Sequence, residues 1–233
     1  FTKVLTQAGA KVVAFDIKPG KFEVNITKKG EVQAGFEKLI KELGVPTILI
    51  NNAGLDSHPS APSSENGRYE DYPEESWDSV IDSHLKGMHI MSQEFLRNIR
   101  PSGKSGSIIN ISSIYGVVSP DQSLYEFRRK GGEEFFKPVA YSVAKSGVFN
   151  FSRWLAEYCR ASKVPVRVNT LVPGGVFAGQ NAEFLEEYNK RNLMGRMANK
   201  DEFNAAILFL SSNKASSYVT GSQIVVDGGW TAR

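Results

Sequence analysis

The segment Thr47-Ile48-Leu49-Ile50-Asn51-Asn52 decides the fold, because it is a nearly continuous apolar run of strand length. A strand of this kind is covered on both faces, as in parallel sheets. Strand-like and helix-like runs alternate on either side of it. The expected strands are residues 11–16, 107–113, 166–172 and 223–226, with 21–26 as a further candidate; the expected helices are residues 28–43, 74–98, 141–160 and 202–210. This alternation predicts an α/β fold with a doubly wound parallel sheet, a three-layer arrangement of the Rossmann type.

Length and composition fit one domain spanning residues 1–233, and no internal repeat or linker interrupts it. The net charge of +3 is too small to indicate a nucleic-acid or anionic-membrane partner. The single cysteine, Cys159, excludes an internal disulfide and fits a reducing compartment, so we expect a cytoplasmic protein. No run approaches the roughly 18 apolar residues of a membrane helix, and we see no signal peptide.

Polar or glycine-rich segments follow several of the expected strands. They are Asp16, Asn51-Asn52-Ala53-Gly54, Ser112-Ser113 and Pro173-Gly174-Gly175-Val176. Each alone fits a helix cap or a turn. Because ligands bind beyond the carboxyl ends of parallel strands, the four together indicate a binding site at one edge of the sheet.

A tyrosine and a lysine lie one helical turn apart in Tyr141-Ser142-Val143-Ala144-Lys145. A nearby ammonium favours the phenolate, which makes Tyr141 a candidate proton donor and acceptor near neutral pH. On spacing alone, an ordinary surface contact is the favoured interpretation of the pair. The polar strand ends favour the catalytic interpretation.

Several ordered motifs together resemble a compact, single-domain short-chain dehydrogenase/reductase. They are Val12-Val13-Ala14-Phe15-Asp16, Asn25-Ile26-Thr27, Asn51-Asn52-Ala53-Gly54, Asn110-Ile111-Ser112-Ser113, Tyr141-Ser142-Val143-Ala144-Lys145, Val168-Asn169 with Pro173-Gly174, and Thr220-Gly221 with Val226-Asp227-Gly228-Gly229. The resemblance implies an NAD(P)-dependent oxidoreductase that interconverts a secondary alcohol and a ketone by hydride transfer.

The resemblance also implies roles for the catalytic residues. Tyr141 would exchange a proton with the substrate oxygen, and Lys145 would lower the pKa of Tyr141 and bind the nicotinamide ribose. Ser113 would hold the substrate oxygen as charge develops on it, while Ser112 would pack or bond locally. No metal is expected.

The implied cofactor is NAD, because a carboxylate at Asp16 would bind the adenosine ribose hydroxyls and repel a 2′-phosphate. Lys18 lies close enough to soften that repulsion, which leaves NADP as the less favoured alternative. The implied cofactor-binding residues are Asp16, Ile17, Asn25, Ile26, Asn52, Ala53, Gly54, Tyr141, Lys145, Pro173, Gly174 and Val176. The usual threonine after Pro173-Gly174 is replaced by Phe177-Ala178, which puts one cofactor contact in doubt.

Two further departures from the family pattern concern the start of the chain and His84. The chain opens at Phe1 inside an expected helix that Gly9 ends in a left-handed turn. The family's first strand and glycine-rich phosphate loop would precede this helix, so we expect about two dozen further residues upstream.

His84 stands where the family usually has an asparagine of a proton relay. It is either a further catalytic residue or a packed histidine bonded locally.

The segment 119–138 is an insert, because Ser113 and Tyr141 are 28 positions apart where the family spaces them by about a dozen. Long loops of this kind often form lids or binding loops, so we expect it to contribute to the substrate pocket. An exposed or subunit-facing loop is the alternative. Its basic triplet, Arg128-Arg129-Lys130, is either a solvated surface or an anion contact. Similar inserts occur in relatives from surface-sugar pathways, which favours a sugar-like or polyhydroxylated substrate.

Two other classes of protein remain as alternatives. A sugar-nucleotide epimerase or dehydratase shares the Tyr141–Lys145 pattern but needs a larger domain than residues 174–233 provide. A catalytically silent dinucleotide-binding or assembly protein of the same fold is the other. The expected partners are a small-molecule alcohol or ketone and further copies of the chain, as a tetramer or dimer.

Overall fold

The computed structural model describes residues 1–56 and 62–232 and contains one parallel sheet of four strands. The strands are β1 (Ile48–Asn51), β2 (Gly106–Ile111), β3 (Val166–Pro173) and β4 (Gln223–Val226), in the order β1-β2-β3-β4. All three pairings are parallel. Four of the expected strands are therefore confirmed, and among them the order does not reverse.

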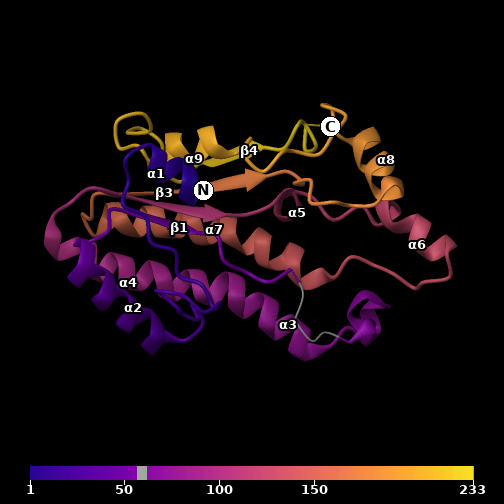
Figure 1. The fold of residues 1–233 in the computed structure, drawn as a ribbon, viewed down its shortest axis with the longest axis horizontal. Coiled ribbons are helices and arrows are strands. Elements are labelled where there is room, and N and C mark those ends of the chain that lie inside the picture. The colour runs from indigo at the N-terminus through magenta and orange to yellow at the C-terminus, as the bar shows by residue number, and fades with distance from the viewer. Residues whose placement is uncertain (57–61, 233) are drawn as a thin grey trace.

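Helices cover both faces of this sheet (Figure 1). One face carries α2 (Lys29–Leu43), α4 (Gly87–Ser102) and α7 (Val139–Ala161), and the other carries α1 (Thr2–Gln7) and α9 (Asn204–Ser211). Apolar residues of β2 alternate between the two cores, since Ile108 packs in the first and Ile109 in the second. The predicted three-layer arrangement is confirmed.

A chain of buried polar side chains holds α7 on the sheet. The Asn51 side-chain amide donates to Asn110 Oδ1 at 2.8 Å, and the Asn110 amide donates to Ser152 Oγ of α7 at 2.9 Å. Thr170 of β3 donates to the same hydroxyl at 2.9 Å. Because unpaired polar groups are costly in a core, these bonds fix the position of α7 relative to three strands.

Residues 11–16 and 21–26 do not form the expected strands. They meet only in an isolated parallel bridge between Asp16 and Glu23, with the Val24 N–H donating to the Asp16 carbonyl at 2.8 Å. Phe15 stacks on Phe22 and packs edge-on against Phe36 of α2, so side-chain packing holds this region in place. The strand prediction is wrong because neither run pairs with a strand of the sheet, and β preference alone builds no ladder.

The expected helix 74–98 is a longer helical run with a change of pitch in the middle. α3 (Glu74–Ile81) passes into the π-helical segment η3 (Asp82–Lys86) and then into α4. A π segment adds a residue to one turn and is frequent at functional sites. It carries His84.

The connecting segments contain short helices where the sequence predicted loops. Of the expected polar loop 56–73, residues 57–61 lie outside the described residues, and the rest contains η1 (Ser63–Asn66) and η2 (Tyr69–Asp71). The segment after β2 contains α5 (Ile114–Val117), η4 (Gln122–Tyr125) and α6 (Glu126–Lys130). α8 (Ala182–Arg191) follows β3, where the sequence does predict a polar helix before residue 202. Within the described ranges, no helix meets the length and apolarity needed to cross a membrane. Gly9, with φ +89, ends α1 in the predicted left-handed turn.

Candidate active site

Ser113, Tyr141 and Lys145 come together at the carboxyl end of β2. Ser113 follows this strand and caps α5, its Oγ accepting the Tyr115 N–H at 3.2 Å. It also lies close enough to Tyr141 to act on the pKa of that phenol. The Nζ of Lys145 lies 5.5 Å from the centre of the Tyr141 ring. The structure therefore brings together the three residues that the sequence predicted as catalytic.

Lys145 is held by backbone contacts in a buried position. Its Nζ donates to the Ile111 carbonyl at 2.9 Å, and its own carbonyl accepts Ser112 Oγ at 2.8 Å. Ser112 thus bonds locally, as predicted. Burial lowers the pKa of Lys145 to about 8, and the charge of Asp56 opposes that effect.

The pKa of Tyr141 is raised above its ordinary value in this structure. Burial is the main cause, the nearby Ser113 side chain works in the opposite direction, and the charge of Asp56 adds to the rise. The Lys145 ammonium donates to the Ile111 carbonyl, and the lowering of the Tyr141 pKa by Lys145 stays a prediction. Tyr141 is therefore protonated at neutral pH.

His84 packs against Tyr141 as a neutral imidazole. The two rings meet edge-on with centres 5.5 Å apart, and His84 Nε2 lies 2.9 Å from the Leu55 carbonyl. A carbonyl only accepts, so Nε2 carries the proton. Nδ1 is buried and has no hydrogen-bond partner among the described residues. Burial, reinforced by the charge of Lys145, lowers the pKa of His84 to about 4.

The loop after β1 lies directly on His84. A Cβ at Gly54 would stand 2.1 Å from His84 Cε1, so only glycine allows this approach. The Leu55 N–H donates to Ser83 Oγ at 3.0 Å, which ties the same loop to η3. Asn52, Ala53 and Gly54 are exposed. These three predicted cofactor residues therefore lie beyond the carboxyl end of β1, at the sheet edge where Ser113 follows β2.

Pro173, Gly174 and Val176 lie beside β4 at that edge. The Gly174 N–H donates to the Val226 carbonyl at 2.9 Å, and a Cβ at Gly174 would lie 2.8 Å from Asp227 Cα. Val176 forms an isolated bridge with Ala198. Because Gly174 has no Cβ, the segment after β3 can pass close to the backbone of Asp227 after β4.

The predicted adenosine-binding residues lie on the irregular segment between α1 and α2. Asp16 is exposed and accepts the Lys18 N–H at Oδ1, 3.1 Å away, while Oδ2 accepts nothing from the described residues. Ile17 is exposed, Asn25 accepts the Thr27 N–H at 2.9 Å, and Ile26 packs against Gly87. An exposed carboxylate with a free oxygen fits the ribose hydroxyls of a dinucleotide.

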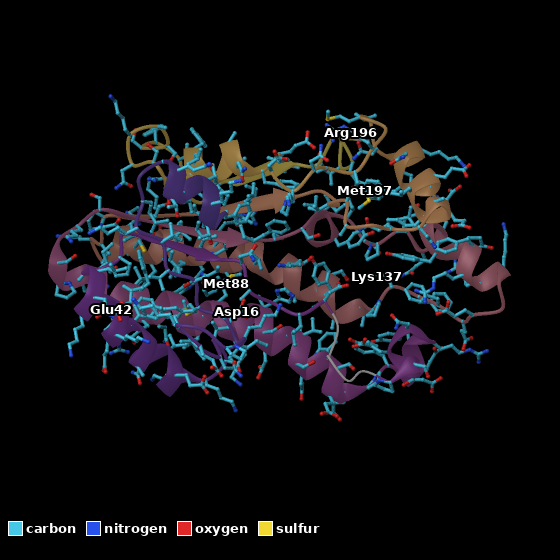
Figure 2. All side chains as sticks on the ribbon, viewed as in Figure 1. Asp16, Glu42, Met88, Lys137, Arg196 and Met197 are labelled. Atoms are coloured by element: carbon cyan, nitrogen blue, oxygen red, sulfur yellow. The ribbon has the colours of Figure 1, made fainter. Side chains whose placement is uncertain are left out.

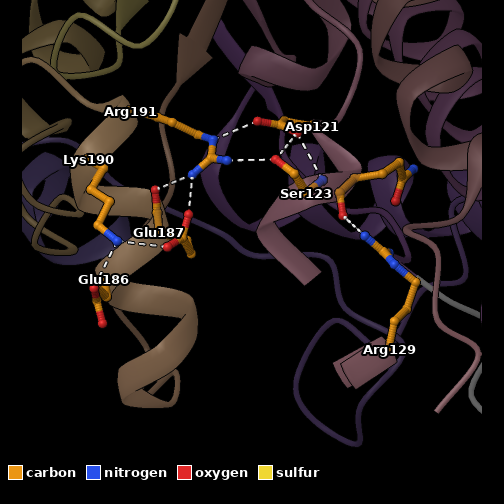
Figure 3. Close-up of polar contacts among 8 residues, drawn as sticks. Asp121, Ser123, Arg129, Glu186, Glu187, Lys190 and Arg191 are labelled. Atoms are coloured by element: carbon orange, nitrogen blue, oxygen red, sulfur yellow. Dashed lines mark hydrogen bonds and ion pairs between the residues drawn. The ribbon is translucent and has the colours of Figure 1, made fainter. Parts of the chain in front are cut away.

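The insert packs on α8, as contacts of Arg191 with Asp121 and Ser123 show (Figure 3), while residues 130–134 are exposed. Arg191 of α8 donates to Asp121 at 2.5 Å and to Ser123 Oγ at 2.6 Å. Tyr125 of the insert lies 5.7 Å, centre to centre, from Phe184 of α8. Ion pairs and aromatic packing therefore join the two segments.

Two members of the basic triplet have partners inside the insert. Arg128 pairs with Glu133 and stacks 3.7 Å from the centre of the Phe135 ring. Arg129 donates to the Phe135 and Gln122 carbonyls at 2.8 and 2.7 Å. Arg128 and Arg129 therefore help to hold the insert together, and the anion contact of the basic triplet stays a prediction.

Lys137, at the end of the insert, is a site residue that the motifs missed. It lies beyond the carboxyl ends of the strands (Figure 2), and its Nζ is 5.5 Å from the centre of the Tyr141 ring. It pairs with Asp56, which follows β1, at 2.7 Å. Its spacing four residues before Tyr141 was a usable signal, but the contact with Asp56 depends on the fold.

A cavity of about 600 Å³ adjoins this position. Residues 65–72 line one side, the insert lines another, and Lys137, Val139 and Ser142 bring it next to Tyr141. The insert was expected to contribute to a substrate pocket, and it supplies one wall of this cavity, whereas nothing in the sequence indicated the wall formed by segment 65–72.

Comparison with known proteins agrees with this geometry. A family model described as "Enoyl-(Acyl carrier protein) reductase" matches residues 2–231. A cis-4-hydroxycyclohexanecarboxylate dehydrogenase from Sinomonas cyclohexanicum is 31% identical, over 99% of this chain and 90% of that protein. A D-arabinitol 2-dehydrogenase (ribulose-forming) from Candida tropicalis is 33% identical, over 88% of this chain and 68% of that protein.

A solved structure extends the match to three dimensions. The short-chain dehydrogenase from Leptospira borgpetersenii with bound NAD⁺ is 30% identical and superposes with a TM-score of 0.85, over 99% of this chain and 86% of that one. The fold, the grouping of Ser113, Tyr141 and Lys145, and these matches lead to one assignment. The chain belongs to the short-chain dehydrogenase/reductase family and is an NAD(P)-dependent oxidoreductase that interconverts a secondary alcohol and a ketone.

Proposed function

We propose that the protein is an NAD-preferring dehydrogenase of polyhydroxylated alcohols, with Ser113, Tyr141 and Lys145 as its catalytic residues. The observation that carries this proposal is the grouping of Ser113, Tyr141 and Lys145, in which Ser113 acts on the pKa of Tyr141 and the Lys145 ammonium lies 5.5 Å from the centre of the Tyr141 ring. The similarity to a D-arabinitol dehydrogenase supports a polyol substrate.

Each catalytic side chain has a task that follows from its position. The Ser113 hydroxyl donates to the substrate oxygen and holds it beside the Tyr141 hydroxyl. Tyr141, protonated at neutral pH, gives its proton to that oxygen during reduction and takes it back during oxidation. The bound nicotinamide supplies or accepts the hydride. Lys145 places a positive charge beside the tyrosine when a phenolate forms.

The preference for NAD rests on Asp16. Its exposed carboxylate has a free oxygen for the ribose hydroxyls, and its charge would repel a 2′-phosphate. The remaining implied contacts are Ile17, Asn25, Ile26, Asn52, Ala53, Gly54, Pro173, Gly174 and Val176, together with Tyr141 and Lys145. The similar structure that contains NAD⁺ supports this choice.

We also propose that His84 is a positioning residue. Its Nε2–H holds the Leu55 carbonyl, and its ring packs against both Gly54 and Tyr141. The imidazole thereby fixes the loop after β1 next to the catalytic tyrosine. We further propose a cytoplasmic homo-oligomer, most simply a tetramer, which the buried free thiol of Cys159 and the exposed Trp154 on α7 support.

The test of this function is alcohol-dependent reduction of the cofactor. Purified protein is mixed with NAD⁺ or NADP⁺ and with D-arabinitol, xylitol, ribitol, D-sorbitol or 2-pentanol, and absorbance at 340 nm is followed. We expect turnover of at least one polyol and at least a tenfold higher kcat/KM with NAD⁺ than with NADP⁺. Cofactor binding without turnover of any alcohol would instead favour a catalytically silent binding protein.

A further inference from the structure

Lys137 and Asp56 form an ion pair beside Tyr141. Lys137, at the end of the insert, donates from Nζ to both carboxylate oxygens of Asp56, at 2.8 and 2.7 Å. The same Nζ lies 5.5 Å from the centre of the Tyr141 ring, and the Nζ of Lys145 lies at the same distance from that centre. Two ammonium groups therefore lie near one phenol, and one of them is paired with a carboxylate.

Lys137 is fixed at its backbone as well as at its side chain. Its N–H donates to Gln122 Oε1 at 2.8 Å, and its carbonyl accepts from Gln122 Nε2 at 3.2 Å. Its side chain is only 15% exposed. A lysine held in this way has less freedom to lose when it forms an ion pair, so its charge keeps a defined position relative to Tyr141.

Asp56 follows a loop that is fixed to the helical run carrying His84. The Leu55 N–H donates to Ser83 Oγ at 3.0 Å, and the Leu55 carbonyl accepts from His84 Nε2 at 2.9 Å. The backbone next to Asp56 is therefore anchored, although the Asp56 side chain is 63% exposed. The ion pair thus joins the loop after β1 to the end of the insert.

The charged and titratable groups that face Tyr141 from the described parts of the chain come from four elements. Lys145 lies on α7 itself, and Lys137 lies on the insert. His84 packs on the ring from η3, and burial lowers its pKa to about 4, so it is neutral near pH 7. Asp56 follows β1. Burial is the main cause of the raised pKa of Tyr141, and the charge of Asp56 adds to it.

The two charges of the pair act on Tyr141 in opposite directions. A phenolate is favoured by a nearby ammonium and disfavoured by a nearby carboxylate. While the pair is intact, each charge offsets part of the effect of the other. Loss of the Asp56 charge leaves an unpaired ammonium beside the ring, whereas loss of the Lys137 charge leaves an unpaired carboxylate.

We propose that Lys137 and Asp56 are positioning residues for proton transfer, which hold an ammonium and a carboxylate beside Tyr141 and set the balance between its phenol and its phenolate. This assignment rests on the proposed function, in which oxidation moves the proton of the substrate hydroxyl to the Tyr141 oxygen as the hydride leaves the carbon that bears this hydroxyl for NAD⁺. The phenolate must be present before that step, so the pair sets the pH range of alcohol oxidation.

The experiment measures the pH dependence of kcat/KM for the fastest alcohol of the panel above, expected to be a pentitol (D-arabinitol, xylitol or ribitol), between about pH 6 and 11 with saturating NAD⁺. Asp56→Asn should move the midpoint of the rising limb to lower pH by at least about 0.5 unit, and Lys137→Met should move it to higher pH by a similar amount. Lys137→Arg keeps the charge and should stay within about 0.2 unit of the wild type. Lost packing alone would not move the midpoint in opposite directions.

A second ion pair on α7 provides matched controls. Glu157 and Arg160 pair near the other end of this helix, roughly 24 Å or more from Tyr141 by the helical rise and well beyond the Debye length of about 10 Å. Glu157→Gln and Arg160→Met remove the same two kinds of charge and should leave the midpoint within about 0.2 unit of the wild type.

The outcomes separate this role from the hydride transfer. Shifts in the same direction in Asp56→Asn and Lys137→Met, or no shift in either of them, would overturn the role of the pair and leave the proposed function standing. If Lys137→Met folds poorly, Asp56→Asn tests the sign by itself, because its side chain is 63% exposed. If no alcohol of the panel is oxidised, the proposed function and this inference fail together.

Discussion

At the scale of single residues, burial sets the ionisation of the active site. It raises the pKa of Tyr141 and lowers the pKa of Lys145 to about 8 and of His84 to about 4. Asp56, outside the buried cluster, acts on all three through its charge. The protonation states of the site therefore depend on packing and on a residue that belongs to none of the catalytic motifs.

His84 makes the stability of the protein depend on pH. Its pKa is about 4 in the folded chain against 6.5 when unperturbed, so between these values the unfolded chain binds more protons. The free energy of unfolding is therefore highest above pH 6.5 and falls as the pH falls toward 4, by roughly 3 kcal/mol for a shift of this size. Urea unfolding between pH 4.5 and 7.5 measures this slope.

Two variants isolate the contribution of His84. His84→Asn should flatten the dependence on pH, whereas His89→Asn, at an exposed histidine on the same helical run, should leave the slope of the wild type. Equal slopes in the wild type and His84→Asn would show that His84 does not titrate in this window.

At the scale of elements, the insert and α8 form one packed unit over the cavity side of the molecule. Leu124 is fully buried, and Tyr188 of α8 stacks on Trp230 with ring centres 4.5 Å apart. Arg191 adds ionic contacts from α8 to the insert (Figure 3). A displacement of α8 therefore displaces the insert, including the end that carries Lys137.

Breaking the ionic link between these elements should weaken substrate binding. We expect Arg191→Met to raise the KM for a pentitol roughly threefold to tenfold, because partly exposed ion pairs contribute about 1 kcal/mol and the insert loses its anchor. kcat should change less than KM, since Tyr141 and Lys145 lie on α7. Steady-state kinetics measures both constants.

Lys190→Met provides the control for this prediction. Lys190 lies on the same helix and pairs with Glu186 and Glu187 of that helix, so its loss should leave KM within twofold. An unchanged KM in Arg191→Met would show that the insert does not contribute to substrate binding.

The elements also indicate what sequence can predict. The apolar patterns of the sequence predict the strand Ile48–Asn51 and the helix Val139–Ala161, because packing on the sheet stabilises the same periodicity of apolar residues. Residues 11–16 have the same β character but form no strand, since a strand also needs a neighbour. Periodicity likewise gave no sign of the π segment at Asp82–Lys86.

The candidate active site likewise contains residues that the sequence predicts and residues that it does not. Ser113, Tyr141 and Lys145 could be found because each occupies a motif at a strand end or on a helix face. Asp56 could not, because its part depends on a contact with Lys137 that only the folded chain brings about. The rise in the pKa of Tyr141 could not be predicted either, since it depends on burial.

At the scale of the whole molecule, one helix connects the core, the site and the surface. α7 bonds to the sheet through Ser152, carries Tyr141 and Lys145, and exposes Trp154 and Tyr158, which stack 5.5 Å apart with planes 8° from parallel. Trp154 is 62% exposed, an unusual position for a large aromatic residue unless it serves an interface. Self-association through α7 would make the position of Tyr141 and Lys145 depend on the assembly of the oligomer.

Replacing Trp154 tests this assembly. Light scattering after size-exclusion chromatography should show an oligomer for the wild type and the mass of a single chain for Trp154→Arg. Lys3→Glu, at an exposed lysine of α1 on the opposite layer, should keep the mass of the wild type. An unchanged oligomer in Trp154→Arg would exclude this part of α7 from the interface.

The central claim is that Tyr141 transfers the proton that accompanies hydride transfer. The most direct measurement compares the wild type and Tyr141→Phe in polyol-dependent formation of NADH at 340 nm, with NADH binding followed by fluorescence. The phenylalanine keeps the ring and removes only the hydroxyl. We predict that kcat falls at least roughly 1,000-fold while the Kd for NADH changes less than threefold. A variant that retains more than a tenth of the wild-type kcat would contradict the account.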